Sequence, residues 1–96
     1  DVVLALALVH HLAMGNNVPL PRIADLLAQA GRGLVVEFVP REDPMVGQLL
    51  AARRDIFADY TLPAFRAAFD QLFVTLDEAP VADSLRTLFL MERRSA

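Results

Sequence analysis

A chain of 96 residues is long enough for one domain and too short for two, and its 55% of apolar residues exceeds the roughly 45–50% of an average soluble domain on a count that includes Gly. The net charge of −3 offers no basic stripe for nucleic acid, and the lack of cysteine excludes disulfides, thiolate metal sites and cysteine nucleophiles. No run approaches the roughly 20 apolar residues of a transmembrane helix, and no signal peptide is recognisable, so we expect a cytoplasmic protein without a membrane partner.

The first part of the chain predicts a strand, a helix and a second strand. The apolar run 1–9 is typical of a strand that is buried on both faces in a parallel sheet, and a loop over 11–19 follows it. Apolar residues at helical spacing predict a helix over 20–30, and the segment 33–39 predicts a second buried strand. These elements form a βαβ unit with two parallel strands.

The second part predicts two helices and then two strands. Asp43 is the expected N-cap of a short helix over about 45–54, and Thr61 is the expected N-cap of the next helix. The extended segments 73–77 and 86–92 follow with no helix between them, which favours an antiparallel pair. The predicted order is therefore β-α-β-α-α-β-β.

The start of the chain suggests a piece of a larger domain. A central parallel strand needs neighbours on both sides, but residues 1–9 have sequence on one side only. We therefore expect residues 1–96 to form a single C-terminal half-domain, with the N-terminal half absent.

Three short motifs accompany these elements: His10-His11-Leu12, Asn16-Asn17-Val18-Pro19 and Glu37-Phe38-Val39-Pro40. With the order of elements, they resemble the C-terminal half of a class I S-adenosylmethionine-dependent methyltransferase, and within that family they are similar to bacterial nodulation-associated methyltransferases. The family has a seven-stranded sheet in the order 3-2-1-4-5-7-6, with strand 7 antiparallel. The resemblance implies an α/β fold here: a partial Rossmann-like methyltransferase sheet of strands 4, 5, 6 and 7 with flanking helices and an antiparallel last strand.

The same resemblance implies a function. The parent protein would use S-adenosylmethionine to methylate a small-molecule or biosynthetic substrate, and Leu8, Val9 and His10 would lie beside the transferred methyl group. The family's glycine-rich loop after strand 1 and the acidic residue that ends strand 2 are not in this chain. We therefore expect the isolated chain to bind the cofactor weakly or not at all, and to be inactive alone.

Candidate site residues come from the rule that open α/β sheets bind ligands at the carboxyl ends of their strands. His10 and His11 are neighbours and would point to opposite sides of an extended segment. We expect His11 to face the substrate as a base or hydrogen-bond donor, because imidazole accepts a proton near neutral pH. An equally open alternative is that this histidine only anchors the loop. With two His and no Cys, we expect no metal site.

Glu37 is a second catalytic candidate, because it interrupts a strand that is expected to be buried. It could contact an amine or hydroxyl of the substrate, or orient His11. It could equally form a structural ion pair with an arginine such as Arg41. Asn16 and Asn17 are candidates for the substrate-binding rim of the same site, although Asn-Asn beside Gly more often forms a simple turn.

Tyr60 is the remaining substrate-binding candidate. With Asp55, Phe57 and Asp59 it forms an aromatic and acidic cluster that could cover a bound substrate. The favoured alternative is that the cluster packs as a small satellite core under a connecting segment.

Two other hypotheses stay open. The apolar strand 2–9 could pair with a second copy of the chain, which would make the protein a non-catalytic interaction module and a homo-oligomer. Half of a nucleotide-binding dehydrogenase is less favoured, because such sheets rarely finish with an antiparallel strand pair.

Overall fold

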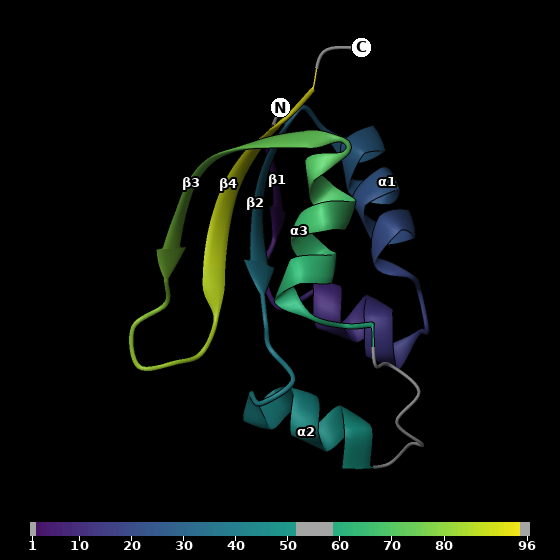
Figure 1. The fold of residues 1–96 in the computed structure, drawn as a ribbon, viewed down its shortest axis with the longest axis vertical. Coiled ribbons are helices and arrows are strands. Elements are labelled where there is room, and N and C mark those ends of the chain that lie inside the picture. Colours follow the sequence, from purple (N-terminus) through teal and green to yellow (C-terminus); the bar gives the residue numbers. More distant parts are fainter. Residues whose placement is uncertain (1, 52–58, 95–96) are drawn as a thin grey trace.

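The structure is a computed structural model that describes residues 2–51 and 59–94 of the chain (Figure 1). Its elements in chain order are β1 (Val2–Ala5), the π-helical turn η1 (His11–Gly15), α1 (Leu20–Ala30), β2 (Gly33–Phe38), α2 (Pro44–Ala51), α3 (Leu62–Asp70), β3 (Phe73–Pro80) and β4 (Thr87–Arg93). The fold class is therefore α/β.

The described strands form one mixed sheet in the order β1-β2-β4-β3. β1 and β2 are parallel, whereas β4 runs antiparallel to both β2 and β3. The predicted parallel pair at the start and antiparallel pair at the end are both confirmed.

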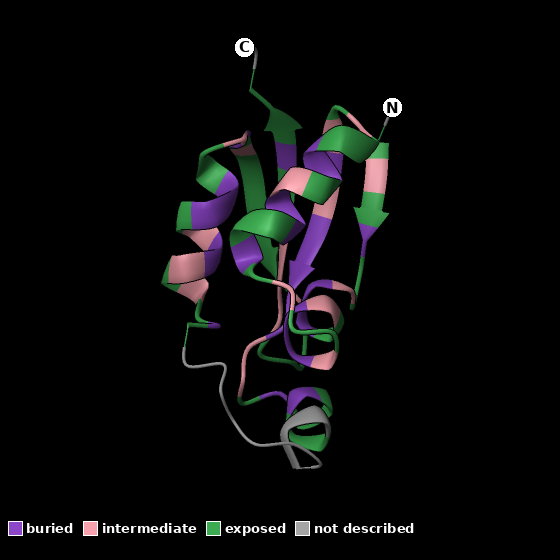
Figure 2. Cartoon of the chain, turned by 90° about the vertical axis from the view of Figure 1, so that its right-hand side faces the viewer, coloured by how far each residue is buried: buried purple, intermediate pink, exposed green. Residues whose placement is uncertain are grey.

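A cluster of aromatic rings joins the helices to the sheet. The ring of Phe65 in α3 lies 5.1 Å from Phe38 of β2 and 5.2 Å from Phe89 of β4, between ring centroids. Phe69, one turn later, stacks on Phe65 at 4.4 Å and contacts Phe73 at 5.9 Å. Both α1 and α3 cover this same face of the sheet, as Figure 2 shows. The core of the described residues is therefore one layer of helix on one layer of sheet.

The opposite face of the sheet carries exposed apolar side chains. Side chains alternate along a strand, so Val35 and Leu90 point away from the face that holds Phe38 and Phe89. Leu4 pairs with Val35, which pairs with Leu90, and the three form a row across the sheet. Leu4 is 68% exposed and Leu90 is 41% exposed. No described helix covers this row.

The first strand differs from its prediction. It was expected over 1–9 and buried on both faces, but β1 ends at Ala5 and its residue Val2 is 65% exposed. The chain turns after Ala5 and becomes helical at Val9. Val9 and Ala13 are both buried and lie four residues apart, as residues on one face of a helix do. The sequence does not show this spacing, because residues 2–8 are all apolar as well.

The other elements agree closely with the sequence. α1 spans the predicted residues, and the cap of α3 is confirmed, because Thr61 Oγ1 accepts the N–H of Ala64 at 3.2 Å. Asp43 Oδ1 accepts the N–H of Met45 at 2.9 Å as α2 begins. The predicted end of α2 near residue 54 falls outside the described residues. β3 continues to Pro80, past its predicted end at residue 77, whereas β4 begins and ends one residue later than predicted.

Two arginines at the end of β4 fasten the helices to the sheet. Arg93 Nη1 donates to the carbonyl of Ala28 in the last turn of α1, at 2.7 Å. Arg94 Nε donates to the carbonyl of Asp70, the last residue of α3, also at 2.7 Å. A cation at a helix C-terminus satisfies free carbonyls and complements the helix dipole. Across residues 2–51 and 59–94, no helix has the length and apolarity to cross a membrane.

Candidate functional site

The candidate site lies at the end of the sheet where β1 and β2 finish. Because these strands are parallel, both deliver their following segments, η1 and α2, to the same edge (lower part of Figure 1). The connection from β3 to β4 returns at this edge, since β4 begins beside the end of β2, with Thr87 paired to Phe38. Three connections that are distant in sequence therefore meet there.

An ion cluster joins these three connections. Arg86 Nε donates to Asp43 Oδ2 at 2.9 Å, and its Nη2 donates to Asp43 Oδ1 at 3.2 Å. A longer contact of 3.5 Å joins Arg86 Nη1 to Glu37 Oε1. The interpretation of Glu37 as a member of a structural ion pair with an arginine is thus confirmed, with Arg86 as a partner.

Glu37 also holds a strained turn. Its Oε1 accepts the N–H of Ala7 at 2.8 Å. Ala7 has φ of 53°, in the left-handed region that costs a non-glycine residue about 1–2 kcal/mol. The hydrogen bond from Ala7 to the carboxylate offsets part of that cost. These contacts of Glu37 go to Ala7 and Arg86, and its predicted role toward a substrate or His11 stays a prediction.

The cluster holds two carboxylates against one guanidinium. The hydrogen bonds from Arg86 keep the pKa of the Asp43 carboxyl below its usual range, against the opposing effect of burial. In return, the Asp43 carboxylate raises the pKa of the Arg86 guanidinium. Asp43 and Glu37 are both buried, and Arg86 is largely so. Removing one partner of such a group leaves an uncompensated charge, so the three residues act as a unit.

The histidine pair is arranged differently from the prediction. An extended segment would have pointed the two rings to opposite sides, but His10 and His11 lie in helical backbone and their ring centroids are 4.4 Å apart. His10 is buried and its Nδ1 has no hydrogen-bond partner, whereas His11 is exposed. Burial first, and then the charges of His11 and Arg86, lower the pKa of His10 to about 4. His10 is therefore a neutral imidazole at neutral pH.

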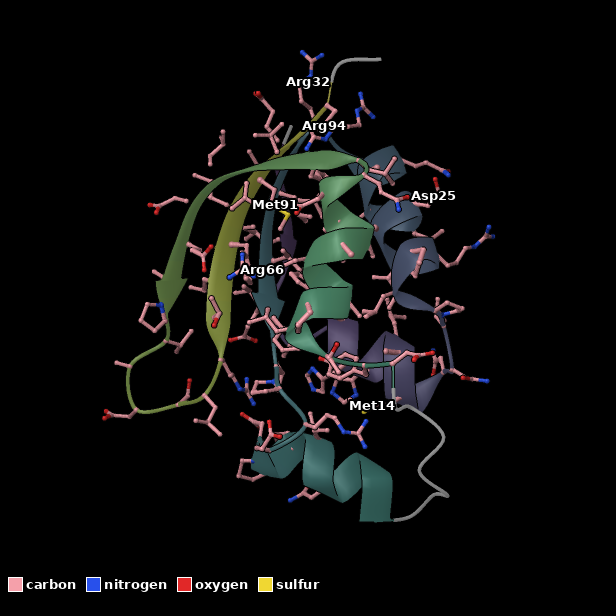
Figure 3. The ribbon with its side chains drawn as sticks, in the orientation of Figure 1. Met14, Asp25, Arg32, Arg66, Met91 and Arg94 are labelled. Atoms are coloured by element: carbon pink, nitrogen blue, oxygen red, sulfur yellow. The ribbon has the colours of Figure 1, made fainter. Side chains whose placement is uncertain are left out.

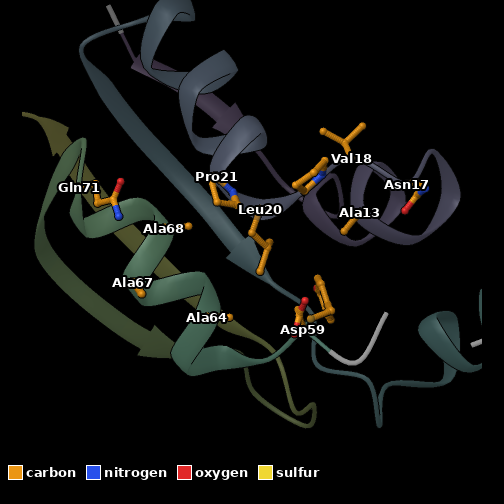
Figure 4. A pocket seen from close by; sticks show the side chains of 12 residues that line it. Ala13, Asn17, Val18, Leu20, Pro21, Asp59, Ala64, Ala67, Ala68 and Gln71 are labelled. Atoms are coloured by element: carbon orange, nitrogen blue, oxygen red, sulfur yellow. The ribbon is translucent and has the colours of Figure 1, made fainter. Parts of the chain in front are cut away.

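Two of the substrate-binding candidates share a pocket. Asn17 and Tyr60 line an open pocket of about 460 Å³ between the η1–α1 connection and the small residues of α3 (Figure 4). Its lining residues do not include Asn16, whose N–H caps η1 by donating to the carbonyl of His11 at 3.1 Å. Glu37 and His11 do not line it either. The predicted candidates therefore divide into two groups: the ion-cluster edge and this pocket.

Tyr60 belongs to the core as well as to the pocket wall. Its hydroxyl donates to the carbonyl of Val39 at 2.5 Å, and its ring stacks on Phe38 at 5.2 Å. Burial raises the pKa of this hydroxyl, so it stays protonated. This agrees with the favoured packing interpretation for Tyr60. Of the other members of the predicted cluster, Asp59 lines the same pocket. Asp55 and Phe57 lie outside the described residues.

Sequence reasoning missed Arg86 altogether and treated Asp43 only as a helix cap. No local pattern could have found their pairing, because 43 residues separate them along the chain. In the part of the chain that the structure describes, no three His, Asp or Glu side chains come together as a metal-binding group.

Comparison with known proteins gives one informative similarity. The chain is 43% identical over 93 residues to Nodulation protein NoeA of Rhizobium meliloti (strain 1021). The match includes 97% of this chain and 20% of the relative, so the chain spans about a fifth of the length of the curated relative it matches. No family model matches the chain. No solved structure matches it significantly.

Burial of neutral His10 makes the stability of the fold depend on pH. The folded chain binds fewer protons than the unfolded chain between about pH 4 and 6.5, so the free energy of unfolding rises with pH in that window. This contribution is complete above pH 6.5 and falls by up to roughly 3 kcal/mol as the pH drops to 4. Urea denaturation across this range measures the slope.

The variant His10→Gln should lose most of that slope, while His11→Gln, at the exposed neighbour, should keep most of it, because burial is the largest cause of the lowered His10 pKa. Asp43 does not confuse the result, because its lowered pKa contributes stability that is lost mainly below its ordinary value of 3.8. A wild-type stability that stays flat from pH 6.5 to 4.5 would contradict the burial of His10.

Proposed function

We propose that this chain is part of an S-adenosylmethionine-dependent methyltransferase that acts on a small-molecule or biosynthetic substrate. The observation that carries the proposal is the strand order β1-β2-β4-β3 with only the first pair parallel. It is the order expected for strands 4, 5, 7 and 6 of that family. Similarity to a much longer relative supports the view that this chain contributes one part of a larger protein.

The described residues fit one wall of a cofactor site. Leu8, Val9 and His10 follow β1 at the carboxyl edge of the sheet, and they change from half-buried to buried. The side chains of Val9 and His10 are buried, so in this proposal half-buried Leu8 and the backbone of the segment face the cofactor. None of the three residues offers a charged group for the ribose or the amino-acid part of the cofactor. We therefore propose that most of the cofactor contacts come from a part of the protein beyond these 96 residues.

S-adenosylmethionine, when bound, supplies an electrophilic methyl group on a sulfonium. The chain's own task is then to orient the acceptor, exclude water and take up a proton, and alignment contributes most of the acceleration. His11 is the proposed base, because its imidazole is exposed at this edge and can accept the proton that the acceptor loses. His10 packs beneath His11 as a neutral ring and limits its movement. Asn17 and Tyr60 are proposed to contact the more distant part of the substrate in their shared pocket.

The full-length protein should bind S-adenosylhomocysteine, the demethylated product of the cofactor, because a methyltransferase site retains the adenosyl and amino-acid contacts after transfer. Isothermal titration calorimetry measures this binding, with ATP as the control nucleotide. Absence of binding by a folded full-length protein would refute the methyltransferase proposal.

The variant His11→Gln should lower kcat by about 10²- to 10⁴-fold, the usual contribution of a general base, and leave the Kd for S-adenosylhomocysteine unchanged. Initial rates of methyl transfer measure the loss. The variant Gln29→Ala, at an exposed residue in the last turn of α1, is the control and should retain kcat to within about 3-fold. An unchanged kcat in His11→Gln would remove this residue from the catalytic role.

A second candidate function is a self-associating interaction module, and the exposure of β1 favours it. β1 is an edge strand of the described sheet, and Val2 and Leu4 are both more than half exposed. An uncovered apolar edge strand is a template for pairing with another chain. In this proposal the isolated chain forms a dimer through its β1 edge.

The variant Leu4→Lys should therefore convert the isolated chain to a monomer, because a charged side chain on an edge strand opposes its pairing with the same strand of a second copy. Light scattering at increasing concentration measures the mass. Leu85→Lys, at an exposed apolar residue outside the sheet, is the control and should not change the mass. A wild-type chain that remains monomeric at high concentration would exclude the module.

A further inference from the structure

Arg86 connects three segments that converge on the candidate site. It lies directly before β4, and its guanidinium binds Asp43 on the β2–α2 connection and Glu37 near the end of β2. Its side chain is 21% exposed, against 7% for Asp43 and 11% for Glu37. The cluster is thus well shielded from solvent, where ion pairs are less screened than on an open surface.

The backbone around Arg86 is itself held in place. The N–H of Arg86 donates to Ser84 Oγ, and its carbonyl accepts the N–H of Val81, both at 3.0 Å. The guanidinium therefore starts from a defined position. Its planar fork then fits both oxygens of Asp43, a geometry that a lysine ammonium cannot reproduce.

The contacts continue from Arg86 to the histidine segment through Glu37. The same Oε1 of Glu37 receives Arg86 Nη1 and the N–H of Ala7. Ala7 is the left-handed residue at which the chain leaves β1, and the helical segment with His10 and His11 begins two residues later. The orientation of that segment thus depends on a turn that a buried carboxylate holds, and Arg86 helps to hold the carboxylate.

We infer that Arg86 is a positioning residue for the proposed methyl transfer: through Glu37 it fixes the Ala7 turn and, with it, the placement of His11 against the substrate. This inference rests on the proposed function. Arg86 reaches the histidine segment through its contact with Glu37, and its charge also contributes to the lowered pKa of the buried His10. Misplacing a reacting group by about 1 Å costs up to about 100-fold in rate, so loss of this contact should be visible in kcat.

The test uses Arg86→Gln and Arg86→Lys in the full-length protein. Arg86→Gln should lower kcat by about 10- to 100-fold and change the Kd for S-adenosylhomocysteine less than about 3-fold. Arg86→Lys keeps the charge and the fold but loses the fork, so it should recover only part of kcat. A merely structural role would instead reduce the fraction of protein that binds S-adenosylhomocysteine and leave kcat per bound site unchanged.

Arg66 offers a matched control. It makes an equally bidentate pair with Glu78, at 3.0 and 2.8 Å, and reaches from α3 across to β3 (Figure 3). That pair is exposed and lies apart from the histidine segment. Arg66→Gln should therefore leave kcat within about 3-fold of the wild type, as most exposed substitutions do.

Hydrogen exchange of the Ala7 amide separates this inference from the proposed function. Exchange should be faster in Arg86→Gln than in the wild type or in Arg66→Gln, whether or not the protein is a methyltransferase. Unchanged exchange overturns the inference, and so does an unchanged kcat in an active enzyme. Faster exchange in a full-length protein that does not bind S-adenosylhomocysteine would support the effect of Arg86 on the Ala7 turn. It would reject the role of Arg86 in methyl transfer and the proposed function.

Discussion

The contact of Phe65 with Phe38 and Phe89 is the constraint on which the rest of this structure depends. It joins α3 to β2 and β4, two strands that pair with each other although they lie far apart in the sequence. α1 packs beside α3 on the same face of the sheet. Because β1 and β2 run parallel, their connections meet at one edge of the sheet that these helices cover. Packing both helices on one face leaves the row that contains Leu4 and Leu90 without cover among the described residues.

At that edge, the protein concentrates charge and strain in a small volume. The Arg86 guanidinium binds the carboxylates of Asp43 and Glu37. Glu37 also accepts the N–H of the left-handed Ala7, and the neutral His10 is buried nearby. Each feature is costly alone, because unpaired buried charge, positive φ and a desolvated imidazole all oppose folding. Such features persist when the surrounding structure fixes them, and they concentrate at functional sites. This favours the ion-cluster edge over the Asn17 pocket as the centre of the chemistry.

The proposed reaction suits the short inventory of catalytic groups in this chain. Methyl transfer from a sulfonium requires alignment more than acid–base chemistry, so one exposed histidine held by a rigid turn is sufficient on this side of the site. The similarity to about a fifth of a longer relative fits a chain that forms one wall of a larger cleft. Both observations direct experiments to the full-length protein.

The sequence by itself determined the α/β class, the span of α1, the cap at Thr61 and the parallel and antiparallel strand pairs, because periodicity and caps are local signals. It misjudged the end of β1, because an apolar run does not distinguish a strand from a buried helical turn. Only the tertiary structure decided that His10 is the buried histidine and that Glu37 pairs with Arg86. Those outcomes depend on residues up to 49 positions apart in the chain, and no local pattern encodes such a distance.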